Sequence, residues 1–335
     1  MKKMKYLIVL LSFLLLMPVG ASGQTDGEEE GDSRIVPVRN KIYLYKNRGG
    51  NIGLCFGDDG VFIIDTQFED ISEDLLKDIR KFTKEPIKYV LNTHHHGDHT
   101  GGNSNMANEG ATIVAHGNVR TNLMNAIETS PNKIHETVLP KITIDQTMTF
   151  YLNREEIVVT HLKNAHTDGD VLVHFTKANV IHTGDVFISG KYPFIDVENG
   201  GTVSGYMEGL EQILGLGNRD TKFIPGHGNV STFEDVKNLK LLLENIYNRV
   251  KFQHLNGKNE QQILAMSEIT AEYDRQGYGE GFITTERFLK TIYDAVAFDY
   301  NRADRDRRAR QIEDIRKKQN AAKANKDNKG EKGDD

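Results

Sequence analysis

The side chains best suited to metal chemistry are concentrated in one short segment that follows an apolar stretch of the chain. Four potential ligands fall within six residues: His94, His96, Asp98 and His99. Imidazole and carboxylate groups suit zinc and similar borderline metals. Alternate residues of an extended loop point the same way, so His94 and His96 can bind one ion. The chain then turns, and Asp98 and His99 lie where a second ion would be bound.

Three later segments each place one further candidate ligand in a turn or at the end of a predicted strand. These candidates are His166 in NAHTDGD, Asp185 in HTGD and His227 in IPGHG. A single histidine or aspartate at such a place is a weak signal. The three together with the first segment form a strong one, and they indicate a metal site rather than a chance histidine-rich loop.

The other titratable residues near these segments are weaker candidates. Asp65 ends a short predicted strand, and two roles are open for it: a hydrogen-bond acceptor for a ligand histidine, or an ordinary strand-terminal residue that starts a turn. We expect the other seven histidines not to bind metal: His95, His116, His135, His161, His174, His182 and His254.

Short strands and amphipathic helices alternate around the candidate ligands. Apolar runs separated by glycine-rich turns predict strands over 35–65, and residues 69–83 have apolar positions at helical spacing. Residues 139–182 are rich in strand-like runs. A long helix is expected to open at Ser231, with Glu234 as the acidic partner of a capping box. Strands that alternate with helices indicate layered α/β architecture.

The segments NTHHHGDHTGGN, NAHTDGD, IHTGD and PGHG resemble those of the metallo-β-lactamase superfamily, in which H-x-H-x-D-H is followed by His, Asp and His. The resemblance spans roughly residues 35 to 250 by motif order and strand pattern. It implies an α/β (α+β) fold, the αββα sandwich of two mixed β-sheets flanked by helices. It also implies two zinc ions per chain.

The same resemblance assigns a role to each candidate ligand. The first metal would be held by His94, His96 and His166. The second would be held by Asp98, His99 and His227. Asp185 would bridge both, as in the glyoxalase II and lactonase branches. The branch of true β-lactamases with a cysteine ligand has that cysteine where Asp185 stands, so this chain departs from that branch at one ligand.

The implied reaction is hydrolysis of an ester, lactone, thioester or amide by a metal-bound hydroxide, with Asp98 orienting the nucleophile or accepting its proton. A β-lactam carboxylate would need a nearby cation. The lysine that cysteine-containing lactamases use for this purpose corresponds to Ile188 here. Lys191 is close in sequence and is the candidate substrate-binding residue, although it also fits a plain surface lysine.

Two other functions stay open at this point. The chain could be a genuine β-lactamase that hydrolyses β-lactam antibiotics. It could also be a non-catalytic metal-binding protein or a diiron redox protein of the same fold. Diiron relatives usually replace a first-motif histidine by glutamate and add a flavin domain, and neither feature is seen in this sequence.

The composition and the N-terminus favour an exported enzyme that acts on a small molecule. The formal net charge of -6 disfavours a nucleic-acid partner, and the oligomeric state cannot be inferred. Three lysines precede an apolar run over 6–19 and small residues over 20–23, which is the order of a secretory signal peptide. We therefore expect a periplasmic or secreted protein with no stable membrane span after cleavage; an uncleaved anchor is the alternative.

The chain is predicted to contain five successive regions. They are a signal peptide (1–23), a flexible acidic leader (24–33), the metallo-β-lactamase domain (34–255), a helical C-terminal extension (256–318) and a charged tail (319–335). The tail has no apolar stripe beyond alanines, so disorder is expected there.

Overall fold

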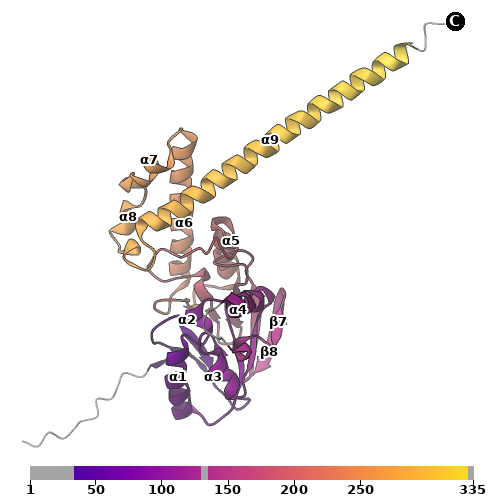
Figure 1. Cartoon of the computed structure of the whole chain (residues 1–335). Coiled ribbons are helices and arrows are strands. Elements are labelled where there is room, and N and C mark those ends of the chain that lie inside the picture. The colour runs from indigo at the N-terminus through magenta and orange to yellow at the C-terminus, as the bar shows by residue number, and fades with distance from the viewer. Residues whose placement is uncertain (1–33, 130–134, 331–335) are drawn as a thin grey trace, which may run out of the picture. The chain divides into compact units, whose positions relative to one another are not determined.

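A computed structural model describes residues 34–129 and 135–330 of the chain (Figure 1). The described residues belong to one compact unit that begins at Arg34. The predicted signal peptide and leader lie outside the described residues. Among the residues that the structure describes, no helix is both long enough and apolar enough to cross a membrane.

The first β-sheet has seven strands that lie side by side in sequence order, β1 to β7. Neighbours are antiparallel from β1 to β4 and parallel from β4 to β7. Their bounds are β1 Ile35–Arg39, β2 Ile42–Tyr45, β3 Ile52–Cys55, β4 Val61–Ile64, β5 Ile87–Leu91, β6 Thr112–His116 and β7 Ile142–Ile144.

The second β-sheet has five strands in the order β12-β11-β10-β9-β8. All neighbours are antiparallel except β11 and β12, which are parallel. The bounds are β8 Thr147–Leu152, β9 Glu155–His161, β10 Val171–Phe175, β11 Val180–His182 and β12 Lys222–Ile224. Both sheets are therefore mixed.

The two sheets pack face to face with helices on their outer faces. Successive side chains of a strand point to opposite faces. In β4, Phe62 and Ile64 accordingly join a core shared with the second sheet, whereas Val61 and Ile63 pack with residues of α1 (Glu69–Phe82) and α3 (Asn103–Asn108). The outer face of the second sheet packs with α5 (Val203–Leu216) and α6 (Phe233–Leu255). The predicted αββα sandwich is confirmed.

The long helix α6 begins one residue later than the sequence suggested. Its N-cap is Thr232, whose hydroxyl accepts a hydrogen bond from the backbone N–H of Asp235. The Asp235 carboxylate accepts in turn from the backbone N–H of Thr232 at 2.8 Å. The capping box is therefore Thr232 with Asp235, and the expected pair of Ser231 with Glu234 was wrong. Ser231 instead exchanges backbone hydrogen bonds with Phe223, which holds it in extended conformation.

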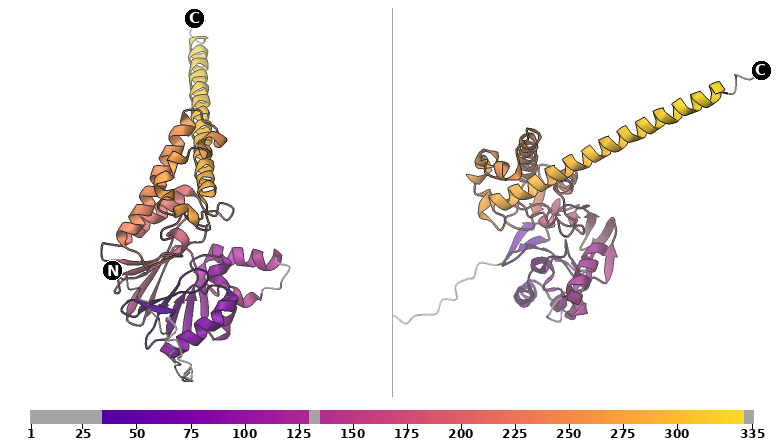
Figure 2. Two further views of the ribbon diagram at one scale, coloured as in Figure 1. Left: turned by 90° about the vertical axis from the view of Figure 1, so that its left-hand side faces the viewer. Right: turned by 45° about the horizontal axis from the view of Figure 1, so that its top comes forward.

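Residues beyond α6 form a helical extension that shares its core with α5 and α6. It comprises α7 (Glu260–Leu264), α8 (Ala271–Asp274) and the long α9 (Thr285–Gly330), which Figure 2 shows running well past the helices that it packs on. Ile263, Phe288 and Ile292 belong to the same buried cluster as Leu239 of α6. The predicted boundary after residue 255 coincides with the end of α6, and it stays a prediction.

The backbone of α9 is helical through Gly330, whereas the sequence predicted disorder from residue 319. The difference has a physical reason. Residues 319–330 are mostly alanine, lysine and asparagine, and alanine and lysine have high intrinsic helix propensity even where no apolar stripe packs. Residues 331–335 lie outside the described residues.

Candidate metal centre

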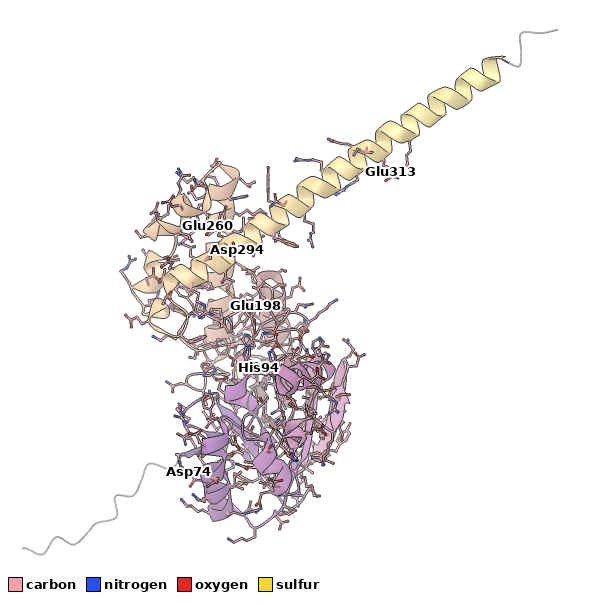
Figure 3. The ribbon with its side chains drawn as sticks, viewed as in Figure 1. Asp74, His94, Glu198, Glu260, Asp294 and Glu313 are labelled. Atoms are coloured by element: carbon pink, nitrogen blue, oxygen red, sulfur yellow. The ribbon has the colours of Figure 1, made fainter. Side chains whose placement is uncertain are left out.

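The candidate ligands come from loops at the ends of strands in both sheets. His94 and His96 follow β5, and Asp98 and His99 lie in the short helix α2 (Gly97–Thr100) that comes next. His166 lies between β9 and β10, Asp185 in a helical turn after β11, and His227 after β12. Parallel neighbours such as β11 and β12 end at the same sheet edge, so segments far apart in sequence converge there. Figure 3 labels His94 within the chain.

His94, His96 and His166 form the first ligand group. The Nδ1 atom of His96 lies 3.1 Å from Nε2 of His94 and 3.0 Å from Nε2 of His166. His94 and His166 are buried. Three ring nitrogens therefore converge on one point, as the resemblance predicted for the first metal.

The atoms behind these rings determine which nitrogen faces inward. The other nitrogen of His166, Nδ1, donates to the backbone carbonyl of Phe194 at 2.8 Å, and Nε2 of His96 donates to the Asp196 carboxylate at 2.8 Å. Nδ1 of His94 lies 3.1 Å from the Thr93 hydroxyl. Each inward nitrogen of a neutral ring thus carries a lone pair, which is what a metal ion needs.

The second ligand group consists of Asp98, His99 and His227. Nε2 of His227 lies 3.2 Å from Oδ2 of Asp98 and 3.4 Å from Nε2 of His99. Behind His99, the Asp65 carboxylate accepts from Nδ1 at 2.8 Å and also from the backbone N–H of Thr93 at 2.7 Å. Asp65 therefore orients a candidate ligand histidine, which is one of the two roles left open for it.

Asp185 lies between the two groups. Its carboxylate oxygens are 3.2 Å from Nε2 of His99, 3.5 Å from Nε2 of His227 and 3.8 Å from Nε2 of His166. One carboxylate thus reaches histidines of both groups. Its Oδ1 atom is buried and accepts no hydrogen bond of acceptable geometry from the described residues. A buried carboxylate oxygen that faces a ring nitrogen needs a partner. That partner is either a proton on the nitrogen or a metal ion bound by both atoms.

The spacing within both groups fits zinc. Zinc binds histidine nitrogen at about 2.0–2.1 Å in tetrahedral geometry, which places neighbouring ligand atoms about 3.3 Å apart. The measured separations within the groups and to Asp185 run from 3.0 Å to 3.8 Å. Among the described residues, four sets of three side chains bring their potential ligand atoms within 4.8 Å of one another. Three of these sets consist of predicted ligands alone. Histidine and aspartate are the donors expected for such an ion.

Charge is distributed unequally between the two groups of the metal-free chain. Burial lowers the pKa of His94 well below its ordinary value and that of His166 to about 4, so these rings are neutral at pH 7. Burial alone would lower the pKa of His227, but the nearby carboxylates of Asp185 and Asp98 outweigh this effect and raise the pKa to about 9. The pKa of Asp185 lies well below its usual range because His99 and His227 outweigh its burial. The second group therefore carries protons that a metal must displace.

The remaining predicted residues have other surroundings. The Nζ atom of Lys191 donates to the backbone carbonyl of Gly277 at 2.8 Å, so this ammonium group is bound to the helical extension. His95 is turned toward Asn122, whose amide lies 3.5 Å from its Nδ1. His182 is buried, and its Nε2 lies 3.2 Å from the carbonyl of Asn51. His116 and His161 stack on each other with ring centroids 3.9 Å apart.

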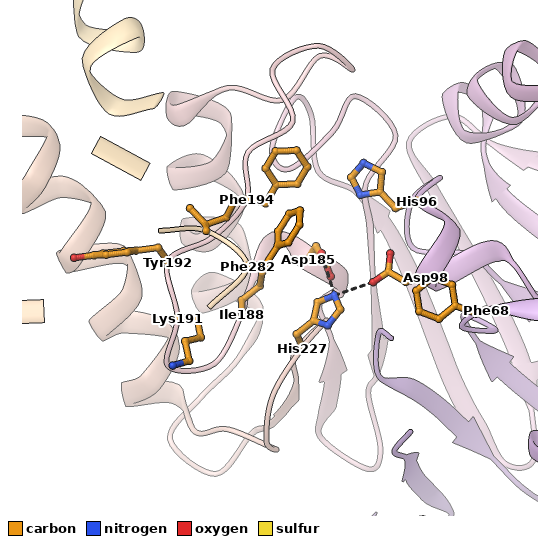
Figure 4. A pocket seen from close by; sticks show the side chains of 11 residues that line it. Phe68, His96, Asp98, Asp185, Ile188, Lys191, Tyr192, Phe194, His227 and Phe282 are labelled. Atoms are coloured by element: carbon orange, nitrogen blue, oxygen red, sulfur yellow. Dashed lines mark ion pairs between the residues drawn. The ribbon is translucent and has the colours of Figure 1, made fainter. Parts of the chain in front are cut away.

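A cavity of about 620 Å³ opens beside the ligands (Figure 4). Four predicted ligands line it: His96, Asp98, Asp185 and His227. The other lining residues are Phe68, Ile188, Lys191, Tyr192, Phe194, Phe282 and Ile283. A carbonyl group in this cavity would be within reach of both ligand groups, which is the arrangement that metal-assisted hydrolysis requires.

Sequence reasoning missed several residues of this site, among them Asp196, Phe282 and Ile283. Asp196 accepts a hydrogen bond from His96, but it lies outside the four segments that contain the candidate ligands. Phe282 and Ile283 belong to the helical extension and line the cavity from far along the chain. No local pattern connects them with the ligands. The sequence holds no signal for them, because the exposure of an aromatic side chain is known only from the folded chain.

Comparison with known proteins agrees with this geometry. Residues 45–231 match the metallo-beta-lactamase superfamily model. That is more than half of the chain, and the chain belongs to this superfamily. It is a metal-dependent hydrolase with histidine and aspartate metal-binding groups.

Individual relatives differ in how much of the chain they match. Metallo-beta-lactamase IND-1 of Chryseobacterium indologenes is 25% identical over 200 residues, which is 57% of this chain and 80% of that protein. The crystal structure of DIM-1 metallo-beta-lactamase, 22% identical, covers 63% of this chain and 96% of its own with a TM-score of 0.52. The sec-alkylsulfatase Pisa1 from Pseudomonas sp., 15% identical, covers 78% of this chain with a TM-score of 0.61, and this chain covers 50% of it. The two structures show a shared fold.

Proposed function

We propose that this protein is an exported binuclear zinc hydrolase that cleaves an ester, lactone, thioester or amide of a small molecule. The observation that carries the proposal is the position of Asp185. Its carboxylate lies 3.2 Å from a histidine nitrogen of one group and 3.8 Å from a histidine nitrogen of the other. A carboxylate shared in this way is suited to hold two ions side by side.

Two zinc ions, when bound, would supply Lewis acidity for the scissile carbonyl and lower the pKa of water. The protein supplies orientation and a base. Asp98 is the acidic residue of the site with the most access to the cavity, since its side chain is 27% exposed and that of Asp185 is 8% exposed. Burial alone would raise the pKa of Asp98, but His227 and His99 outweigh this effect and lower the pKa. The Asp98 carboxylate is therefore ionised at neutral pH. We assign to it the orientation of the attacking water and the acceptance of its proton.

Export is proposed from the N-terminal sequence. The order of basic, apolar and small residues over 1–23 is that of a secretory signal peptide. Export would place the mature chain in the periplasm or outside the cell. The chain has a single cysteine, Cys55, which is buried, so an oxidising compartment would impose no internal disulfide.

β-Lactam hydrolysis is the second candidate, because IND-1 and DIM-1 are both named metallo-beta-lactamases. Two features weigh against it. Asp185 occupies the place of the cysteine ligand, and the one lysine that lines the cavity is bound to Gly277. We expect Asp185→Cys to bring no gain in nitrocefin hydrolysis, because the Lys191 ammonium group would still be bound to Gly277. A tenfold gain would show that the ligand alone limits lactamase activity.

The substrate class can be tested with purified mature protein loaded with zinc. Turnover of nitrocefin, an acyl lactone, an acyl thioester and a secondary alkyl sulfate is compared before and after chelation and after zinc is restored. We expect the lactone or thioester to react fastest and to lose its turnover reversibly with the metal. Preference for nitrocefin would make the protein a β-lactamase, and preference for the alkyl sulfate would contradict a carbonyl substrate.

A further inference from the structure

The lining of the cavity is apolar apart from the candidate ligands and Lys191. Beyond the four candidate ligands and Lys191, every lining residue is aromatic or aliphatic: Phe68, Ile188, Tyr192, Phe194, Phe282 and Ile283. Such a lining recognises its ligand by burial of apolar surface, which is favourable in proportion to the area removed from water. Polar recognition would need convergent donors and acceptors.

The two polar groups of the lining other than the ligands are already bound to the helical extension. The Lys191 ammonium group donates to the carbonyl of Gly277 at 2.8 Å. The Tyr192 hydroxyl donates to the carboxylate of Asp274 at 3.0 Å. A polar substituent of a substrate would lose its hydration here and find no free partner among the lining side chains, so an apolar substituent is favoured.

Phe194 places the apolar wall directly beside the first ligand group. Its backbone carbonyl accepts from His166, and its ring lies nearly parallel to the His96 ring with centroids 5.9 Å apart. The wall therefore starts next to the reacting atoms. A group attached directly to the scissile carbonyl would contact Phe194 first.

Phe282 continues this wall from the C-terminal extension. Its ring meets Phe194 edge to face at 5.8 Å, and Figure 4 shows both rings near the ligand side chains. The guanidinium group of Arg287 lies 5.0 Å from the centroid of each ring and holds the pair together. Ile283, only 4% exposed, anchors the segment in the core.

Phe282 itself is 77% exposed, although its ring position is held on two sides. A large aromatic side chain that is kept in place at the mouth of a reactive cavity, and left open to water, is typical of a binding surface. Burial of that ring by a substrate would gain free energy without the cost of ordering a mobile side chain.

We infer that the substrate of the proposed hydrolase carries an apolar acyl group of several carbons on its scissile carbonyl, and that Phe194, Phe282 and Ile283 bind this group. The C-terminal extension is thereby the specificity-determining part of the site. This inference rests on the proposed function, since it names the substrate class of the same site.

The test is the dependence of turnover on acyl-chain length. Zinc-loaded protein is given thioesters with acetyl, butanoyl, hexanoyl and octanoyl groups, and kcat/KM is measured for the native chain and for Phe282→Ala. Each buried methylene contributes about fourfold in binding, so the native kcat/KM is expected to rise by about that factor per methylene until the cavity is filled. In Phe282→Ala the rise should fall to less than about twofold per methylene.

Phe298→Ala is the matched control. Phe298 is an exposed phenylalanine of α9, the helix that follows the segment with Phe282; it is 60% exposed and does not line the cavity. We expect this variant to keep both the native rates and the native chain-length dependence. The inference is overturned if Phe282→Ala keeps the native dependence, or if the native protein itself shows none. A thermal melt checks that Phe282→Ala is folded.

A binding measurement separates failure of the inference from failure of the proposed function. The Kd of acetate, butanoate, hexanoate and octanoate is measured by calorimetry on zinc-loaded protein and on Phe282→Ala. If no carbonyl compound is hydrolysed, the proposed function fails, but chain-length-dependent binding that Phe282→Ala weakens still supports the apolar site. If thioesters are hydrolysed and binding does not depend on chain length, the inference fails alone.

Discussion

His96 and His166 of the first group, and His99 of the second, are each oriented by an acceptor behind the ring. Asp65 holds His99, Asp196 holds His96, and the carbonyl of Phe194 holds His166. These contacts select the tautomer that turns a lone pair inward, so that the site is arranged before an ion arrives. Pre-arranged ligands lower the entropic cost of binding the ion.

Asp98 should be essential for turnover and dispensable for folding. Asp98→Asn removes the base and one charge at the second group while keeping the size of the side chain. We expect kcat to fall by at least about a hundredfold, as loss of a positioned base typically causes. Melting temperature should change little, because the Asp98 side chain is partly exposed and packs no core.

The control for this variant is Asp58→Asn, at an exposed aspartate in the turn between β3 and β4. It removes the same charge far from the ligands and should keep native turnover. Native activity in Asp98→Asn would contradict the assigned site.

Asp196 should matter for metal affinity although it is not a predicted ligand. Asp196→Asn replaces the charged acceptor of His96 by a neutral amide. Loss of such an outer contact costs about 10–100-fold in metal affinity, so we expect at least tenfold weaker zinc binding in a competition with a chromophoric chelator. Glu198→Gln, at an exposed position two residues on, is the control. Equal affinity in the two variants would show that Asp196 does not support the site.

The metal-free chain should owe part of its stability to the protonated state of His227. The folded chain raises the pKa of this residue from 6.5 to about 9. A group with a raised folded-state pKa contributes its full stabilisation below its unfolded value and loses it as pH rises through the folded value. The free energy of unfolding of the native chain, minus that of His227→Gln, should therefore be largest below pH 6.5 and shrink toward pH 9.

Urea unfolding in the presence of a chelator, across this pH range, measures that difference. Subtraction of the His227→Gln variant removes the contributions of titratable groups that the substitution leaves unchanged. A difference that stays constant with pH would show that His227 is not paired with Asp98 and Asp185 in the metal-free chain.

At the level of elements, local patterns predicted most strands and helices, but not the contacts between distant segments. The periodicity over 69–83 predicted α1, and the turn-bounded runs over 35–65 predicted β1 to β4, because these signals are contained within each segment. The capping box of α6 was misplaced by one residue. Ser231 with Glu234 and Thr232 with Asp235 fit the pattern equally well, and only the backbone pairing of Ser231 with Phe223 decides between them.

The capping box can be tested by two substitutions at the start of α6. Thr232→Ala should lower the free energy of unfolding by about 1 kcal/mol, because the N-cap hydroxyl satisfies a backbone N–H that has no helical partner. Glu234→Ala should be nearly neutral, since Glu234 makes an exposed ion pair with Lys237 at 3.4 Å and no capping contact. Urea denaturation measures both. A larger cost for Glu234→Ala than for Thr232→Ala would favour the box predicted from the sequence.

At the level of the whole molecule, the site combines one part that can be predicted from the sequence with another that cannot. The seven candidate ligands could be predicted from the sequence, because metal binding restricts the residue type and the ligands occur in short motifs. The apolar wall of the cavity could not be predicted from the sequence. Phe282 lies more than fifty residues past His227, and any apolar residue could occupy its position in the wall. Its role depends on how the extension packs on α5 and α6, which is a property of the folded chain.

The helical extension also explains why the cavity differs from a cleft built by the sandwich alone. The described residues of α9 that are buried, such as Phe288 and Ile292, lie in its first half and fix the segment that carries Phe282. Lys191 and Tyr192 reach from the sandwich to Gly277 and Asp274 of the extension. The extension is therefore part of the hydrolase site and not an appendage beside it.

The most direct test of the binuclear site is the metal content of the protein after loading with zinc and removal of free ions. Elemental analysis of the native chain and of Asp185→Ala, with protein concentration from amino-acid analysis, gives zinc ions per chain. The geometry predicts close to two ions for the native chain and a marked loss in the variant, because Asp185 contacts both ligand groups. A native chain that binds no zinc, or a variant that binds as much as the native chain, would contradict the proposed metal centre.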